Sequence, residues 1–344
     1  MNVMYQRRAA ALLEVLGVFL AGQLLRDQME AWIVNHKILP PINPLDLLTA
    51  HATNADLLLA SRQMLAALMI QYFAYFLIII PINWWHRRRG AASYGLTRAG
   101  RSWKTLFLAG LATASLCEWP VAVHSLVNAF HPLGATVPWR QAFFDMSWRR
   151  WQFWLFAGIM SYALIPVVEE LIFRGYYQRR LAEDWSDGPA IAGATCLFTF
   201  AHGQYLIANL YNVTMIATLL ISALGFGVVY AWTRSLIPSM IAHSIIDIPM
   251  TTPWYAALLA VFVVGIFFAR RGGTRALQVF AKTKVSACVF LAIVCIAYDI
   301  AADRIGALTW VAIGMVVVAV VIEAMDRQRI LALAEAGERA HAAG

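Results

Sequence analysis

The chain contains 344 residues, of which 61% are hydrophobic and 13% are charged. Ordinary soluble domains contain roughly 45–50% apolar and about 25% charged residues, so this composition argues against a soluble enzyme. The net charge of +8 does not indicate a nucleic-acid partner, because the basic residues form short clusters beside apolar runs, as in oriented membrane proteins. We therefore expect an all-helical, polytopic membrane protein that contacts lipid.

Apolar segments that suit membrane spans occur along almost the whole chain. They cover about residues 9–25, 63–85, 103–130, 151–175, 188–204, 209–232, 236–250, 254–269, 285–302 and 306–326. Some of them are short, so we expect a bundle of about 8–10 spans. The first segment carries Glu14 and lacks a small-residue cleavage site, which indicates an uncleaved span and not a signal peptide.

Basic clusters alternate with neutral loops along the chain. A cytoplasmic N-terminus would place these clusters on the cytoplasmic side: Arg87 to Arg89, Arg179 and Arg180, Arg234, Arg270 and Arg271, and Arg327 and Arg329. We therefore expect a multi-pass protein of the plasma (inner) membrane with both termini in the cytoplasm. Residues 131–150 disagree with this pattern, and their mixture of arginine and tryptophan suits an interfacial segment.

Three regions follow from these patterns. Residues 1–130 are predicted to form N-terminal transmembrane helices with a long exterior or re-entrant loop at 26–62, which contains a proline-rich stretch. Residues 131–250 are predicted to form the core that carries the chemistry, and residues 251–344 to form C-terminal transmembrane helices and a short polar tail. The cysteines lie in apolar segments without a CxxC pair and are interpreted as buried thiols: Cys117, Cys196, Cys288 and Cys295.

Two adjacent carboxylates, Glu169 and Glu170, lie inside an apolar run. An ionisable residue in the middle of a span costs at least about 2.5–3.5 kcal/mol, so it requires a partner or a function. On a helix, Glu170 and Arg174 are four residues apart and can form an ion pair, whereas Glu169 points about 100° away. The spacing thus predicts one neutralised glutamate and one free glutamate.

A histidine, His202, ends the apolar run that follows the turn signal at residues 184–189. This turn lies midway between Glu169 and His202 along the chain. Two unbroken helices that meet at the turn would place the two side chains at similar depth. We therefore expect Glu169 and His202 to be neighbours.

A second histidine, His243, lies four residues before Asp247 and behind the helix break at Pro238. On one helical face, Asp247 can accept a hydrogen bond from His243 and fix the imidazole tautomer, or hold the ring as imidazolium.

Each of these patterns also suits a purely structural role, as an ion pair near the headgroups or an interhelical hydrogen bond. Other ionisable residues in or near the spans lack comparable local partners and are interpreted as interfacial or packing residues: Glu14, Glu118, His124, Asp299 and Glu323.

Together the motifs suit hydrolysis. A carboxylate beside a histidine can activate water, and a second histidine held by an acid can donate to an oxyanion. Glu169, His202 and His243 could also bind zinc, and the residue pattern leaves both mechanisms open. The HExxH and GxSxG motifs of other hydrolases are absent from the sequence.

Two functions of other classes use the same residues. In a transporter or channel they would relay protons or bind an ion, and in a non-catalytic immunity or scaffold protein they would only hold the helices together.

The order EExxxR (Glu169, Glu170, Arg174), FxxxH (Phe198, His202) and Hxxx(N/D) (His243, Asp247) resembles the CPBP intramembrane proteases, the CAAX prenyl protease type II and bacteriocin-processing (Abi) family. The resemblance covers about residues 151–250. It implies an endopeptidase that cleaves a membrane-associated protein or peptide near the membrane surface. It also implies that Glu169 and His202 activate water, that His243 and residue 247 stabilise the oxyanion, and that Glu170 and Arg174 brace the site.

The preferred mechanism for such a site needs no cofactor, with zinc as the alternative. The site is expected between the spans at 151–175, 188–204 and 236–250, and to open toward the cytoplasm. Prenyl proteases of this type carry asparagine where this chain has Asp247. Because a carboxylate cannot donate to an oxyanion, we hypothesise that Asp247 charges and orients His243, whose imidazolium then donates.

Overall fold

The computed structural model describes residues 3–40, 53–88, 90–131, 158–202, 210–248 and 252–268, and every regular element in these ranges is a helix. The predicted all-helical fold is confirmed. Four helices are long and apolar enough to cross a membrane: α1 (Val3–Asn35), α3 (Asn54–Trp85), α4 (Trp103–Phe130) and α10 (Leu210–Thr233). The predicted spans at 285–302 and 306–326 lie outside the described residues, so the total of 8–10 spans stays a prediction.

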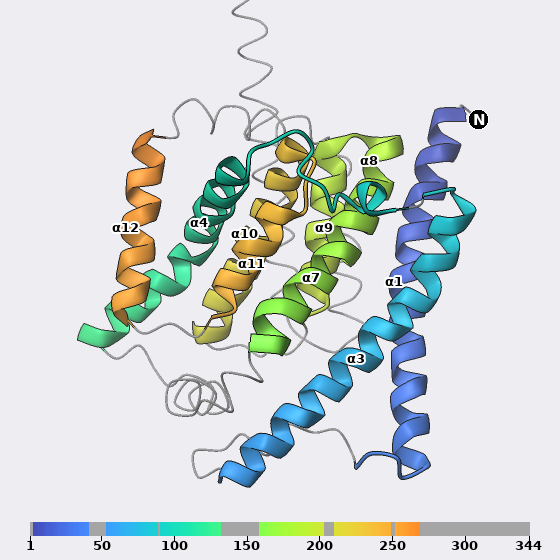
Figure 1. Cartoon of the computed structure of the whole chain (residues 1–344), viewed down its shortest axis with the longest axis horizontal. Helices are drawn as coiled ribbons and strands as arrows, with labels where there is room; N and C mark the ends of the chain where they lie inside the picture. Colours follow the sequence, from blue (N-terminus) through green and yellow to red (C-terminus); the bar gives the residue numbers. More distant parts are fainter. Residues whose placement is uncertain are drawn as a thin grey trace, which may run out of the picture.

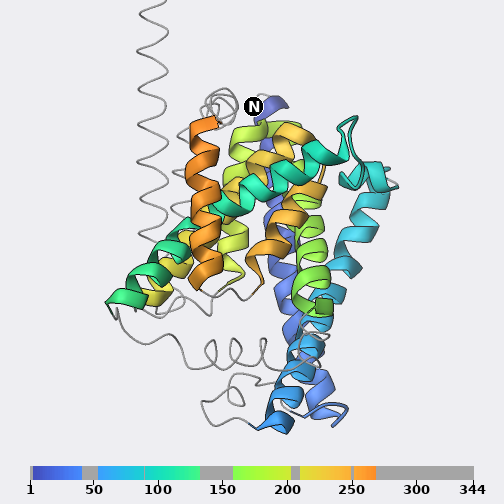
Figure 2. The ribbon, with the colours of Figure 1, turned by 60° about the vertical axis from the view of Figure 1, so that its left-hand side comes forward.

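Figure 1 shows how the helices are arranged. Helices α1 and α3 lie at one side of the bundle and α4 and α12 (Thr252–Phe268) at the other, with α7, α9, α10 and α11 between them. In the turned view of Figure 2, the lower parts of α1 and α3, drawn in blue, project beyond the other coloured helices. The middle group of helices carries the three sequence motifs.

The N-terminal helices are longer than the sequence predicted. The loop expected at 26–62 was placed too widely, because α1 continues to Asn35 and α3 begins at Asn54. No proline or glycine interrupts residues 26–35, so the helix has no reason to stop there. Thr53 caps α3 and forms a capping box with Asp56, whose pKa is lowered by the hydrogen bonds from Thr53. Residues 41–52 of the predicted exterior or re-entrant loop lie outside the described residues.

One continuous helix carries the two adjacent glutamates. It consists of π-helix η2 (Gly158–Leu164), α7 (Ile165–Glu170), π-helix η3 (Leu171–Gln178) and α8 (Arg179–Trp185). It ends at Ser186, where φ is +97°, a value that a non-glycine residue rarely adopts. Helix α9 (Asp187–Phe200) then returns along α8 and η3. The break predicted at 184–189 is therefore confirmed.

Helix α4 packs against the side of the core that lies away from α1 and α3. It packs against α10, α11 (Ile237–Ile246) and α12. At Gly110 of α4, an added Cβ would lie 2.7 Å from Ile241 and 3.0 Å from the Pro238 carbonyl oxygen. Because glycine has no side chain, α4 can approach the start of α11 closely at this position. Helix α11 carries His243 in its last turn. Pro238 stands in the first turn of α11, as the predicted helix break requires.

The basic clusters within the described ranges gather at one end of the bundle. Arg88, after α3, pairs with Glu183 of α8. Arg234, after α10, pairs with Asp187 at the start of α9 over 2.8 Å. Spans of alternating direction place every second loop on the same side of a membrane. The clustering of these arginines therefore agrees with the alternation of basic and neutral loops in the sequence.

The described cysteines agree with the sequence interpretation, since Cys117 and Cys196 are buried thiols that form no disulfide among the described residues. Cys288 and Cys295 lie outside the described residues.

Candidate functional site

The predicted ion pair between Glu170 and Arg174 is present in the interior of the bundle. Arg174 Nη1 lies 2.8 Å from Glu170 Oε1, and both side chains are completely buried. Arg174 Nη2 donates to the Ala223 carbonyl at 3.0 Å. The guanidinium carbon also lies 4.7 Å from the Phe198 ring centroid and 5.0 Å from that of Phe226. Ring faces and a carboxylate together compensate the desolvated charge.

Glu169 points away from this pair, as the helical spacing predicted. Its Oε1 accepts a hydrogen bond from the Tyr72 hydroxyl at 3.2 Å. Its Oε2 is buried and has no hydrogen-bond partner among the described residues. The imidazole of His243 faces this oxygen, with its Nε2 3.8 Å from Oε2. Glu169 therefore presents one oxygen that can receive a proton. It stands next to a π-helical segment, and such segments are frequent at functional sites.

His243 is the junction of the three carboxylates of the site. Its Nδ1 donates to Glu170 Oε1 at 3.0 Å, and its Nε2 lies 3.8 Å from both Glu169 Oε2 and Asp247 Oδ2. The ring also stacks on Phe226 with a centroid separation of 5.1 Å. Glu170 and Phe226 thus orient the imidazole and aim Nε2 at Glu169.

The expected hydrogen bond between His243 and Asp247 needs correction. Their separation of 3.8 Å exceeds a hydrogen bond, although it allows electrostatic attraction. Glu170 takes the orienting role, because its helix packs against α11 and brings the carboxylate to Nδ1. The i, i+4 rule correctly placed Asp247 near His243. It could not predict that Glu170, 73 residues away in the chain, lies closer to the ring.

His202 lies in the turn that follows α9. Its Nδ1 donates to the Phe198 carbonyl at 2.8 Å, which leaves Nε2 as the nitrogen that can accept a proton in the neutral ring. The Phe198 ring lies 4.7 Å from the ring of His202 and 5.7 Å from that of His243. Phe198 therefore links both histidines. Within the described contacts no hydrogen bond joins His202 to Glu169, so their direct proximity stays a prediction.

The sequence leaves zinc as the alternative cofactor for this site. No group of three or more His, Cys, Asp or Glu residues in the described ranges is placed to hold a metal ion. Glu170 Oε1 is already occupied by Arg174 and His243. The zinc ligand set considered from the sequence, Glu169, His202 and His243, is thus not assembled in this arrangement.

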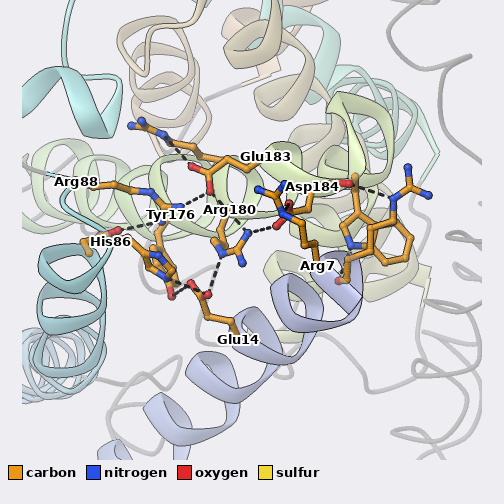
Figure 3. Close-up of polar contacts among 12 residues, drawn as sticks. Arg7, Glu14, His86, Arg88, Tyr176, Arg180, Glu183 and Asp184 are labelled. Atoms are coloured by element: carbon orange, nitrogen blue, oxygen red, sulfur yellow. Dashed lines mark hydrogen bonds and ion pairs between the residues drawn. The ribbon is translucent and has the colours of Figure 1, made fainter. Parts of the chain in front are cut away.

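A second polar cluster lies toward the C-terminal end of the helix that carries Glu169 and Glu170. The sequence interpretation missed this cluster. Glu14 of α1 accepts from the Tyr176 hydroxyl at 3.0 Å and from Arg180 Nε at 2.8 Å, and it also contacts His86 at 3.2 Å (Figure 3). Arg180 donates further to Asp184 at 2.7 Å. Glu14, interpreted from the sequence as an interfacial or packing residue, therefore ties α1 and the end of α3 to η3 and α8.

These features define a class: a helical membrane protein with a buried carboxylate and histidine site between its spans. Residues 150–249 match the family model for Rce1-like proteins, described as type II CAAX prenyl endopeptidase Rce1-like. The resemblance predicted from the three motifs is therefore confirmed. The match supports a CAAX-type intramembrane protease in general, a hydrolase of the membrane. No match was found among curated proteins or solved structures.

Proposed function

We propose that the protein is an intramembrane endopeptidase that hydrolyses a peptide bond of a membrane-associated protein or peptide. The observation that carries this proposal is Glu169 Oε2, which is buried, has no hydrogen-bond partner in the described part of the chain and faces His243 Nε2 at 3.8 Å. Both groups belong to the segment that matches the protease family. A buried carboxylate with one unoccupied oxygen suits a general base.

In this mechanism Glu169 accepts a proton from water while the water oxygen attacks the scissile carbonyl carbon. His202 assists through Nε2, the ring nitrogen left available by the bond from Nδ1 to Phe198. The carbonyl oxygen becomes an oxyanion, which accepts a hydrogen bond from His243 Nε2. The carbon–nitrogen bond then breaks, and the proton held by Glu169 passes to the departing amine.

His243 can donate from Nε2 while Nδ1 also donates to Glu170 if the ring is an imidazolium. The carboxylates of Glu169, Glu170 and Asp247 around the ring supply the opposite charge that this form requires. Glu170 and Arg174 act as positioning residues in this mechanism, because Glu170 holds the ring and Arg174 compensates Glu170.

The substrate class and orientation are part of the proposal. The family name describes CAAX prenyl endopeptidases, so a membrane-bound peptide with a prenylated cysteine followed by a short C-terminal extension is the first candidate substrate. We place the basic end of the bundle in the cytoplasm, with both termini on that side of the plasma (inner) membrane. Substrate would then enter from the cytoplasmic surface of the bilayer.

We expect the purified protein in liposomes to cleave such a peptide, with the bond identified by mass spectrometry. Matched peptides with and without the isoprenoid chain test the substrate class. We expect activity to persist with a metal chelator, because the proposed steps use protein side chains and water alone. Loss of activity with the chelator and recovery with zinc would overturn the metal-free mechanism. Ion flux without cleavage of either peptide would instead support a transporter.

The role of Asp247 can be tested separately. If its charge supports the imidazolium, Asp247→Asn should lower kcat by about tenfold, or about 1.4 kcal/mol of transition-state stabilisation. Asp187→Asn is the matched control, because it removes a carboxylate from the exposed pair with Arg234. Equal cleavage by Asp247→Asn and wild type would show that Glu169 and Glu170 suffice to charge His243.

A further inference from the structure

Helix α3 contributes one polar side chain to the candidate site, although it lies outside the segment that matches the protease family. The Tyr72 hydroxyl donates to Glu169 Oε1 at 3.2 Å, and the tyrosine is only 3% exposed. The two residues are 97 positions apart in the chain. This contact is therefore a product of helix packing and not of a local motif.

The Tyr72 hydrogen bond distinguishes the two oxygens of Glu169. Oε1 is occupied by the tyrosine, whereas Oε2 has no hydrogen-bond partner among the described residues and faces His243. A carboxylate that is held at one oxygen cannot rotate freely about its last side-chain bond. The oxygen that faces His243 is thus selected by a residue on another helix.

Two sets of contacts fix α3 relative to the glutamate helix. Tyr72 and Tyr75 belong to the same buried core cluster as Val168, Ile172 and Phe173, which flank Glu169 and Glu170. The second set is the Glu14 cluster, where the end of α3 at His86 and helix α1 meet Tyr176 and Arg180 (Figure 3). Glu169 and Tyr176 stand seven residues apart on one helix. The core cluster therefore holds this helix at the site, and the Glu14 cluster holds it beyond the site.

We propose that Tyr72 is a positioning residue that orients Glu169 for catalysis. Its hydroxyl holds Oε1, so that Oε2 is the oxygen that takes the proton from water. This inference rests on the proposed protease function, in which Glu169 is the general base. It assigns the N-terminal helices a part in the reaction beyond anchoring the chain in lipid.

The test compares Tyr72→Phe with Tyr75→Phe in the liposome cleavage assay. Both changes keep the ring and remove a buried hydroxyl from α3, but the Tyr75 hydroxyl donates to the Phe19 carbonyl and not to Glu169. We expect Tyr72→Phe to lower kcat by about tenfold, as for the loss of a hydrogen bond to a charged group, with KM unchanged. Tyr75→Phe should leave kcat near the wild-type value.

A spectroscopic measurement keeps the inference separate from the function. The infrared carboxylate bands of Tyr72→Phe should differ from those of wild type, and the difference should vanish when both proteins also carry Glu169→Gln. An unchanged kcat, an equal fall in Tyr75→Phe or the absence of this infrared difference would overturn the role of Tyr72. If wild type cleaves no peptide but the infrared difference is present, the proposed function fails while the contact stands.

Discussion

Glu169→Gln is expected to lower kcat for peptide cleavage by about 100- to 10,000-fold, the usual contribution of a general base. Glutamine has nearly the same shape and can still accept the hydrogen bond from Tyr72, but its amide does not take a proton from water at neutral pH. The fold should therefore survive while the proton-accepting oxygen is lost. Cleavage rates of purified protein in liposomes, together with the thermal unfolding midpoint, measure the two effects independently.

The matched control for this substitution is Glu183→Gln. Glu183 pairs with Arg88 at the basic end of the bundle, and 38% of its side chain is exposed. Its replacement should change cleavage little, because exposed ion pairs contribute about 0–1 kcal/mol. Cleavage by Glu169→Gln at the wild-type rate would contradict the proposed base.

Arg174→Met is expected to destabilise the folded protein by about 3–5 kcal/mol, since it leaves Glu170 as a buried charge without its main cation. Methionine fills the space between Phe198 and Phe226 but supplies no charge and no donor to the Ala223 carbonyl. Denaturant unfolding in mild detergent measures the loss. Activity should fall as well, because Glu170 also holds His243.

Two further variants make this prediction specific. Arg234→Met removes an exposed partner of Asp187 and should cost at most about 1 kcal/mol. The double variant Glu170→Gln with Arg174→Met should recover part of the stability, because the buried charge disappears with its partner. It should not recover cleavage, since His243 loses the carboxylate that orients it. Equal stability of Arg174→Met and Arg234→Met would contradict the structural role of the buried pair.

The two glutamates illustrate how far helical spacing alone can assign roles. The i, i+4 distance identified the Glu170–Arg174 pair, and the rotation per residue separated Glu169 from it. Both features are local, so they hold wherever the helix packs. The same rule applied to His243 and Asp247 found a neighbour at 3.8 Å but not the shorter contact with Glu170.

Tyr72 and Glu14 show what such reasoning misses. Tyr72 lies in an aromatic and apolar run, where it resembles a residue that packs in the core or faces lipid. Glu14 stands among apolar residues of α1 with no cation three or four residues away. Their partners, Glu169 and the Tyr176–Arg180 pair, are 97 or more positions away. No local pattern carries that information.

The amino-acid sequence alone shows that the chain is helical and suited to a lipid environment, and it locates the glutamates, the arginine and the histidines of the candidate site. It could do so because hydropathy and the helical repeat act within one segment. Tertiary structure decided the partners: Glu170 rather than Asp247 on His243 Nδ1, Tyr72 on Glu169, and Glu14 on the end of the glutamate helix. These contacts depend on how helices cross, which is set by side-chain packing between segments far apart in the chain.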